Sequence, residues 1–120
     1  MRENIIKDKS LRFAIRIVNL YKLLSGERKE FVMSKQLLRS GTSVGANIQE
    51  AQNGESKADF IHKLGIAQKE TNETLYWLEL LKETDYIAKE EFESMHSDAT
   101  EILKIIRTII LNTKKNIHNS

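Results

Sequence analysis

Apolar periodicity constrains this chain more than any other feature, because hydrophobic residues recur every three or four positions through most of its 120 residues. That spacing is typical of one face of an α-helix, and no stretch shows the alternation of a half-buried strand. The sequence contains no proline and is rich in Leu, Ile, Lys and Glu, so nothing in it interrupts long helices. The sequence therefore predicts an all-α protein.

Helix boundaries follow from the breaks in this pattern. Four helices are expected, at about residues 10–25, 27–52, 56–84 and 88–116. Ser10 is a good N-cap for the first, Gly26 suits a left-handed C-terminal cap, and Ser56 can cap the third. The connections are short, so neighbouring helices should be antiparallel. We expect residues 1–120 to form one domain, an antiparallel up-down-up-down four-helix bundle.

Two glycines, Gly41 and Gly45, lie inside the second expected helix, where each costs about 1 kcal/mol relative to alanine. Their spacing of four places both on the core-facing side. A stripe without side chains lets another helix approach closely, or leaves room for a large neighbour such as Phe13 or Phe60. The alternative is a hinge or a ligand-shaped gap at the glycines. We favour close packing.

Composition excludes several classes of protein. The chain has no cysteine, which rules out disulfides, thiolate metal sites and a cysteine nucleophile. It shows no secretory signal and no apolar segment long enough to span a bilayer, so we expect a cytoplasmic protein without membrane contact. The net charge of +2 is too small to indicate nucleic-acid binding by itself. Evidence for such binding must come from local clusters of charge.

Two carboxylate–histidine pairs at helical spacing, Glu93–His96 and Asp59–His62, resemble the pairs that build di-iron sites in some bundles. In an antiparallel hairpin turning near Tyr86, however, the two histidines would lie about 20 Å apart along the helix axes. The chain also has no Gly-rich phosphate loop and no Ser-His-Asp set that a bundle would bring together. We therefore expect no metal site, no cofactor, no catalytic residue and no enzymatic activity.

Several expected helices carry more apolar surface than one bundle core needs. In the first, a second apolar stripe lies roughly 150° from the stripe that contains Phe13. Exposing all of this surface would exceed what a monomer normally tolerates in water. A wide core face is the alternative; we favour contact between subunits. The residues expected at that interface are Leu11, Ile15, Val18, Ile66, Trp77, Leu80, Ile102, Ile105 and Ile109.

Basic residues form stripes on three of the expected helices. In a single subunit such stripes are most simply solvated helix faces. A symmetric oligomer would repeat them into a continuous positive surface, which favours sequence-independent, salt-sensitive contacts with nucleic-acid phosphates. The candidate nucleic-acid-binding residues are Arg12, Arg16, Arg28, Lys35, Arg39, Lys104, Arg107, Lys114 and Lys115.

The segments QLLRSGTSVGANIQEA at 36–51 and KADFIHKLGIAQKETNETLYWLELL at 57–81 resemble the 23S rRNA intervening-sequence protein family, a ribosomal-protein-like family of four-helix bundles. The chain departs from the pattern of many members at Gly45, where they have proline, and at Ala51, where they have glycine. The motif residues are Gly41, Ser43, Val44, Gly45, Asn47, Ile48 and Glu50.

Polar residues of the second expected helix have simpler roles than catalysis. The hydroxyls of Ser40, Thr42 and Ser43 should bond to backbone carbonyls one turn earlier rather than act as nucleophiles. The motif residues Asn47 and Glu50 lie on the flank of this helix. We expect them to hydrogen-bond across a helix or subunit boundary, in preference to contacting a ligand.

The resemblance implies a bacterial four-helix bundle that assembles as a ring, commonly a pentamer, and has no enzymatic activity. It also implies a relationship to the accessory protein of diversity-generating retroelements, which binds nucleic acid and a reverse transcriptase. Two hypotheses follow. The first is a homo-oligomeric RNA- or DNA-binding accessory protein associated with rRNA intervening sequences. The second is a scaffold that binds another protein and has no nucleic-acid role.

Overall fold

The structure is a computed structural model that describes residues 2–118, with side chains placed for residues 5–116. Within the described range the chain forms four helices and no strand, which confirms the all-α prediction. The helices are α1 (Arg2–Gly26), α2 (Met33–Gln52), α3 (Lys57–Glu83) and α4 (Lys89–His118).

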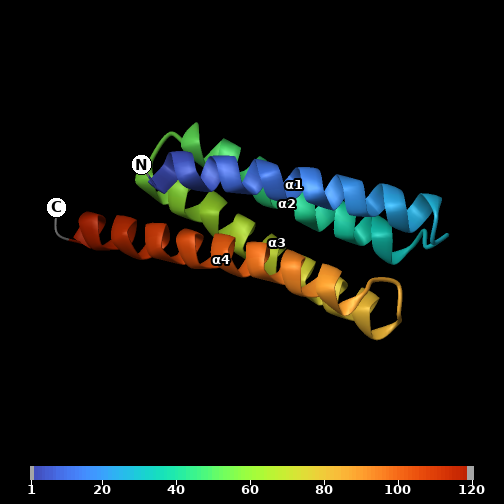
Figure 1. The fold of residues 1–120 in the computed structure, drawn as a ribbon. Helices are drawn as coiled ribbons and strands as arrows, with labels where there is room; N and C mark the ends of the chain where they lie inside the picture. Colours follow the sequence, from blue (N-terminus) through green and yellow to red (C-terminus); the bar gives the residue numbers. More distant parts are fainter. Residues whose placement is uncertain (1, 119–120) are drawn as a thin grey trace.

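The helices form an elongated bundle whose Cα atoms span 53 × 22 × 20 Å. Figure 1 shows that the chain reverses direction at each connection, so the beginning of α1 and the end of α4 lie at the same end of the bundle. Each helix contacts its neighbours in the order α1, α2, α3, α4, and α4 returns to contact α1. Among the described residues, the backbones of the diagonal pairs, α1 with α3 and α2 with α4, do not approach each other closely.

The first helix begins earlier than the sequence analysis predicted. It starts at Arg2 rather than at Ser10, because Ile6 is buried and extends the core-facing stripe upstream. Ser10 is therefore not an N-cap; it is buried inside α1, where its hydroxyl donates to the carbonyl of Lys7 at 3.0 Å. Gly26 is also not a left-handed cap, since no described glycine has a positive φ.

The second helix begins at Met33 rather than at residue 27, and Glu30 explains why. The Glu30 carboxylate accepts hydrogen bonds from the backbone N–H groups of Val32, Met33 and Ser34 at 3.1, 3.0 and 2.6 Å. The Ser34 hydroxyl in turn donates to the Glu30 carbonyl at 2.8 Å. Donors at a helix start have no partner within the helix, and the helix dipole favours a negative charge there. Glu30 thus fixes the first turn of α2.

Glu30 is buried, and burial by itself would raise its pKa. The three backbone N–H groups, together with the Ser34 side chain, outweigh that effect and lower the pKa of Glu30 from its ordinary value of 4.5. The carboxylate is therefore held in its charged form at neutral pH.

The third helix begins and ends close to the prediction. Ser56 is its N-cap, and the Ser56 hydroxyl oxygen accepts a hydrogen bond from the backbone N–H of Asp59 at 3.1 Å. The helix ends at Glu83, one residue before the expected Thr84. Capping by Ser56 confirms what the sequence indicated at this position.

A single cluster of buried apolar side chains from all four helices forms the core. Its largest fully buried members include Phe13, Ile17, Leu37, Ile48, Leu78 and Ile106. Burying such side chains is the main stabilising term, at about 25 cal/mol for each Å² of apolar surface removed from water.

Gly41 and Gly45 allow α1 and α2 to approach closely. A Cβ atom added to Gly41 would lie 2.6 Å from the Ile17 side chain, and one added to Gly45 would lie 3.3 Å from the Ser10 carbonyl oxygen. The neighbour is thus Ile17 and the α1 backbone, not a phenylalanine. The packing interpretation of the two glycines is confirmed.

Candidate nucleic-acid and subunit interfaces

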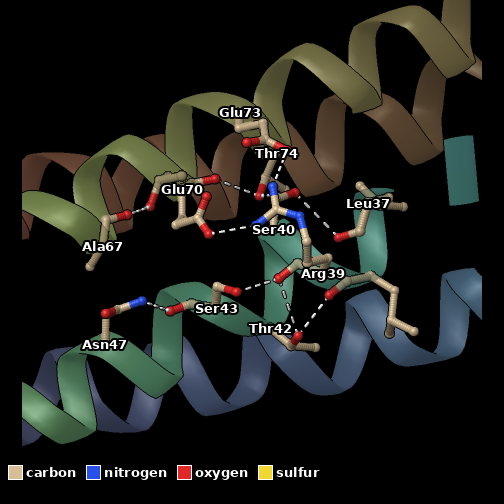
Figure 2. Close-up of polar contacts among 12 residues, drawn as sticks. Leu37, Arg39, Ser40, Thr42, Ser43, Asn47, Ala67, Glu70, Glu73 and Thr74 are labelled. Carbon is tan, nitrogen blue, oxygen red and sulfur yellow. Dashed lines mark hydrogen bonds and ion pairs between the residues drawn. The ribbon is translucent and has the colours of Figure 1, made fainter. Parts of the chain in front are cut away.

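A polar cluster joins α2 to α3 around Arg39 (Figure 2). The Arg39 guanidinium donates to Glu70 at 2.9 Å and also to Glu73, which accepts a further hydrogen bond from the Trp77 indole N–H at 3.0 Å. The Trp77 indole and the Arg39 guanidinium lower the pKa of Glu73, and the two carboxylates raise the pKa of Arg39. The charge of Arg39 is therefore neutralised within the subunit.

Beneath this cluster, two buried hydroxyls meet across the α2–α3 contact. The Thr74 Oγ1 atom lies 2.9 Å from the Ser40 Oγ atom and 2.8 Å from the Glu70 carbonyl oxygen. The Ser40 Oγ atom lies 3.4 Å from the Leu37 carbonyl oxygen. Every buried side-chain nitrogen or oxygen in the described part of the chain has a partner, as buried polar groups require. This layer holds α2 against α3.

Other polar residues of α2 behave largely as predicted. The hydroxyls of Thr42 and Ser43 donate to carbonyls one turn earlier, at 2.7 and 2.5 Å, which confirms their backbone role. Glu50 pairs with Lys63 of α3 at 3.3 Å, so its expected contact across a helix boundary is also confirmed. Asn47 differs from the expected contact across a boundary. Its side-chain amide donates to the Ser43 carbonyl of its own helix at 2.8 Å.

Three further arginines of the candidate set also have acidic partners. Arg16 of α1 pairs with Asp98 of α4 at 2.5 Å. Arg28, in the α1–α2 connection, reaches Glu91 of α4 at 3.2 Å. Arg12 pairs with an aspartate one turn earlier in α1, at 3.0 Å. Exposed pairs like these contribute only about 0–1 kcal/mol each, but they leave the arginines partly compensated as phosphate ligands.

The other five candidate cations are exposed and form no ion pair with any described residue. They are Lys35, Lys104, Arg107, Lys114 and Lys115.

Four of these five cations lie in the second half of α4, which makes this helix electrically asymmetric. From residue 102 to residue 120 the sequence has those four Lys and Arg residues and no Asp or Glu. From residue 89 to residue 101 it has five Asp or Glu residues and one Lys. Cations near a helix C-terminus are also favoured by the helix dipole. The basic half of α4, residues 102–118, is thus the most concentrated uncompensated positive charge that the structure describes.

The residues expected at a subunit interface divide into two groups. Ile102 and Ile109 are buried in the core of the single chain, so their assignment to a subunit interface was wrong. The reason is that α4 packs against both α1 and α3 and needs a wide apolar face. For this helix the wide-core alternative is correct.

The remaining expected interface residues lie at or near the surface. Leu11 and Ile15 of α1 are 60% and 52% exposed. The partly buried members are Val18, Ile66, Trp77, Leu80 and Ile105. Sequence reasoning missed Tyr76, which is 58% exposed and stacks edge-on against Trp77 with ring centroids 5.0 Å apart. The available signal was the adjacent pair of large aromatic residues, Tyr76 and Trp77, of which only Trp77 was expected at the interface.

The described side chains include no group of three or more His, Cys, Asp or Glu residues placed to hold a metal ion. His62 and His96 are both exposed. None of the helices over residues 2–118 is long and apolar enough to cross a membrane.

Comparison with known proteins connects this geometry to a family. The family model for the 23S rRNA-intervening sequence protein matches residues 2–108. The chain belongs to this family. A crystal structure of a protein of unknown function, from the S23 ribosomal protein family of Bacteroides thetaiotaomicron, is 64% identical, with a TM-score of 0.91. The match covers 92% of this chain and 98% of that one.

No curated protein matches the chain. The family model and the crystal structure confirm the family and the four-helix fold expected from the sequence. The solved relative is itself described as having unknown function, so the family membership brings no assigned biochemical activity with it.

Proposed function

We propose that this chain is a non-catalytic, cytoplasmic accessory protein that forms a homo-oligomer and binds RNA or DNA without sequence preference, in association with rRNA intervening sequences. The observation that carries the proposal is the basic half of α4, where four exposed cations have no acidic partner among the described residues. Such cations bind phosphates by releasing counterions, without reading the bases.

The spacing of these cations suits an extended phosphate backbone. Lys104 and Lys115 are eleven residues apart, which is about 16 Å along the helix. A duplex carries one negative charge for about every 1.7 Å of its axis, so several phosphates face a surface of this length. The paired arginines contribute less, because a phosphate would have to displace their carboxylates.

Oligomerisation would bring several copies of this basic half together. Exposed apolar residues on α1 and α3 support self-association, since isolated proteins rarely leave large adjoining apolar surfaces in water. The family resemblance implies a ring, commonly of five subunits. A ring repeats the same half-helix at each subunit, and this increases affinity through multivalency without any new contact.

The decisive experiment compares two triple variants that remove the same charge. The first changes Lys104, Arg107 and Lys114 to Gln, and the control changes Lys29, Lys57 and Lys89 to Gln. Each variant lowers the formal net charge from +2 to −1. Fluorescence anisotropy would measure binding to a labelled RNA hairpin and a labelled DNA duplex at low salt.

We expect the α4 variant to lose at least tenfold in affinity for both nucleic acids, and the control to stay within about threefold of wild type. Equal losses of affinity in both variants would mean that binding depends only on net charge, and this would contradict the proposed site. Absence of salt-sensitive binding by wild type would contradict the nucleic-acid role and favour the protein-scaffold hypothesis.

A further inference from the structure

Two helix faces outside the core each combine exposed apolar side chains with charges. The α1 face contains Leu11, Ile15 and Val18 between Asp8 and Lys22. The α3 face contains Tyr76 and Leu80, with Lys69 on one side and Glu79 and Glu83 on the other. Both faces consist of exposed or half-buried residues, so folding of one subunit leaves them largely uncovered.

The two faces lie on opposite corners of the bundle. Helices α1 and α3 each contact α2 and α4, and the described backbones of α1 and α3 do not approach each other closely. Figure 1 shows that α1 and α3 run in the same direction along the bundle, because the chain reverses twice between them. One subunit therefore presents the α1 face on one side and the α3 face on the other.

The charges on the two faces are complementary at matching separations. Asp8 and Lys22 are fourteen residues apart, as are Lys69 and Glu83, so each pair spans about 21 Å of helix. If the two helices pack side by side in the same direction, Asp8 lies level with Lys69 and Lys22 lies level with Glu83. The reverse direction would place like charges together, which costs binding energy.

The same alignment also brings the largest apolar side chains together. With Asp8 level with Lys69, Ile15 lies level with Tyr76, and both are more than half exposed in the single subunit. Asp8 and Glu83 already have neighbouring cations within their own helices, at 3.0 and 3.3 Å. Those pairs are exposed, so a partner subunit can replace them at little cost.

We infer that a second copy of this chain covers these faces, with the α1 face of one subunit packed in parallel on the α3 face of the next. The inference rests on the oligomerisation included in the proposed function and names its two surfaces. One heterologous contact of this kind covers both faces, whereas isologous pairing would need separate α1–α1 and α3–α3 contacts. Heterologous contacts generate closed rings when the rotation between subunits closes, and open filaments when it does not.

A mixing experiment tests this arrangement directly. The Ile15→Lys variant has a damaged α1 face and an intact α3 face, and the Tyr76→Lys variant has the reverse. We expect each variant alone to sediment as a 13.9 kDa monomer. Mixed at equal concentration, they should form a heterodimer of twice that mass, because one intact contact remains and both of its outer ends are blocked. Isologous contacts would instead leave at least one of the variants self-associated and produce no new species on mixing.

A charge exchange provides a second readout that keeps the full assembly. Lys22→Glu and Glu83→Lys should each weaken assembly, because each places like charges level with one another across the contact. The double variant restores opposite charges and should recover the wild-type mass. If the double variant is no better assembled than the single variants, the parallel register is wrong.

Both sets of variants change exposed or half-buried residues, so their helical circular dichroism should match that of wild type. Each variant should still unfold cooperatively, with a lower midpoint where the subunit contact is lost, because association stabilises the folded state. Wild type that sediments as a monomer would contradict the oligomeric part of the proposed function. Wild type that is oligomeric, with Ile15→Lys and Tyr76→Lys equally oligomeric, would contradict only the assignment of these two faces.

Discussion

At the scale of single residues, Gly41 is a position where the fold leaves no room for a side chain. The side chain of Ile17 already occupies the space that a Cβ atom would need. The glycine is unfavourable for the isolated helix, and its value lies in the close contact of α1 with α2. Sequence spacing could predict that Gly41 faces the core, but it could not identify Ile17, because that depends on where the two helices cross.

Gly41→Ala should lower the free energy of unfolding by about 1–2 kcal/mol, because overpacking outweighs the gain in helix propensity. Gly65→Ala is the matched control, since nothing lies within 4 Å of the position of its Cβ atom. That variant should instead gain up to about 1 kcal/mol. Urea unfolding followed by circular dichroism measures both; equal stabilisation of the two variants would contradict the close contact.

Glu30→Ala should lower the free energy of unfolding by about 1 kcal/mol at pH 7, because the first turn of α2 loses its cap. The folded-state pKa of Glu30 lies below its ordinary value of 4.5, so this stability is present above pH 4.5. It is lost as the pH falls through the folded-state pKa, and the variant should then approach wild type. Glu27→Ala, at an exposed carboxylate of the same connection, should change stability little at any pH.

At the scale of helices, the sequence predicted which segments are helical better than it predicted the residues at which the helices begin and end. The Ser56 cap is local, so α3 was placed to within a residue of its observed bounds. The start of α2 depends on Glu30, which precedes the helix and caps it from an unusual position. Ser10 misled the prediction for α1 because a serine can cap a helix or lie buried within one, and only the packing of Ile6 decides between these.

The ion pairs of the candidate site could not be predicted from the sequence. Arg39 lies 31 residues from Glu70, and Arg16 lies 82 residues from Asp98, so neither partner can be found from helical spacing. The charge asymmetry of α4, in contrast, is visible in the sequence alone. The structure adds that the four cations of its basic half are exposed and form no ion pair with any described residue.

The salt dependence of DNA binding should show how many of these cations contact phosphates. Each phosphate neutralised contributes about −0.9 to the slope of log K against log salt concentration. Removing Lys104, Arg107 and Lys114 should therefore reduce the steepness of the slope by about 2.7 for each subunit that contacts the duplex. A slope unchanged by the three substitutions, measured by anisotropy from 50 to 200 mM salt, would place the phosphate contacts elsewhere.

At the scale of the whole molecule, two features that are separate in one subunit would act together in the proposed assembly. Apolar faces on α1 and α3 remain uncovered in one subunit, and the proposed association of copies would repeat the basic half of α4 around the assembly. The single-chain core explains the burial of Ile102 and Ile109, so only part of the apolar excess seen in the sequence is available between subunits. The part that remains is the basis of the proposed assembly.

Sedimentation equilibrium of the wild-type protein at micromolar concentration tests the proposed self-association most directly. We expect a single species several times heavier than the 13.9 kDa chain, and a five-membered ring would have a mass of about 70 kDa. A folded species of 13.9 kDa, unchanged as the protein concentration rises, would contradict it.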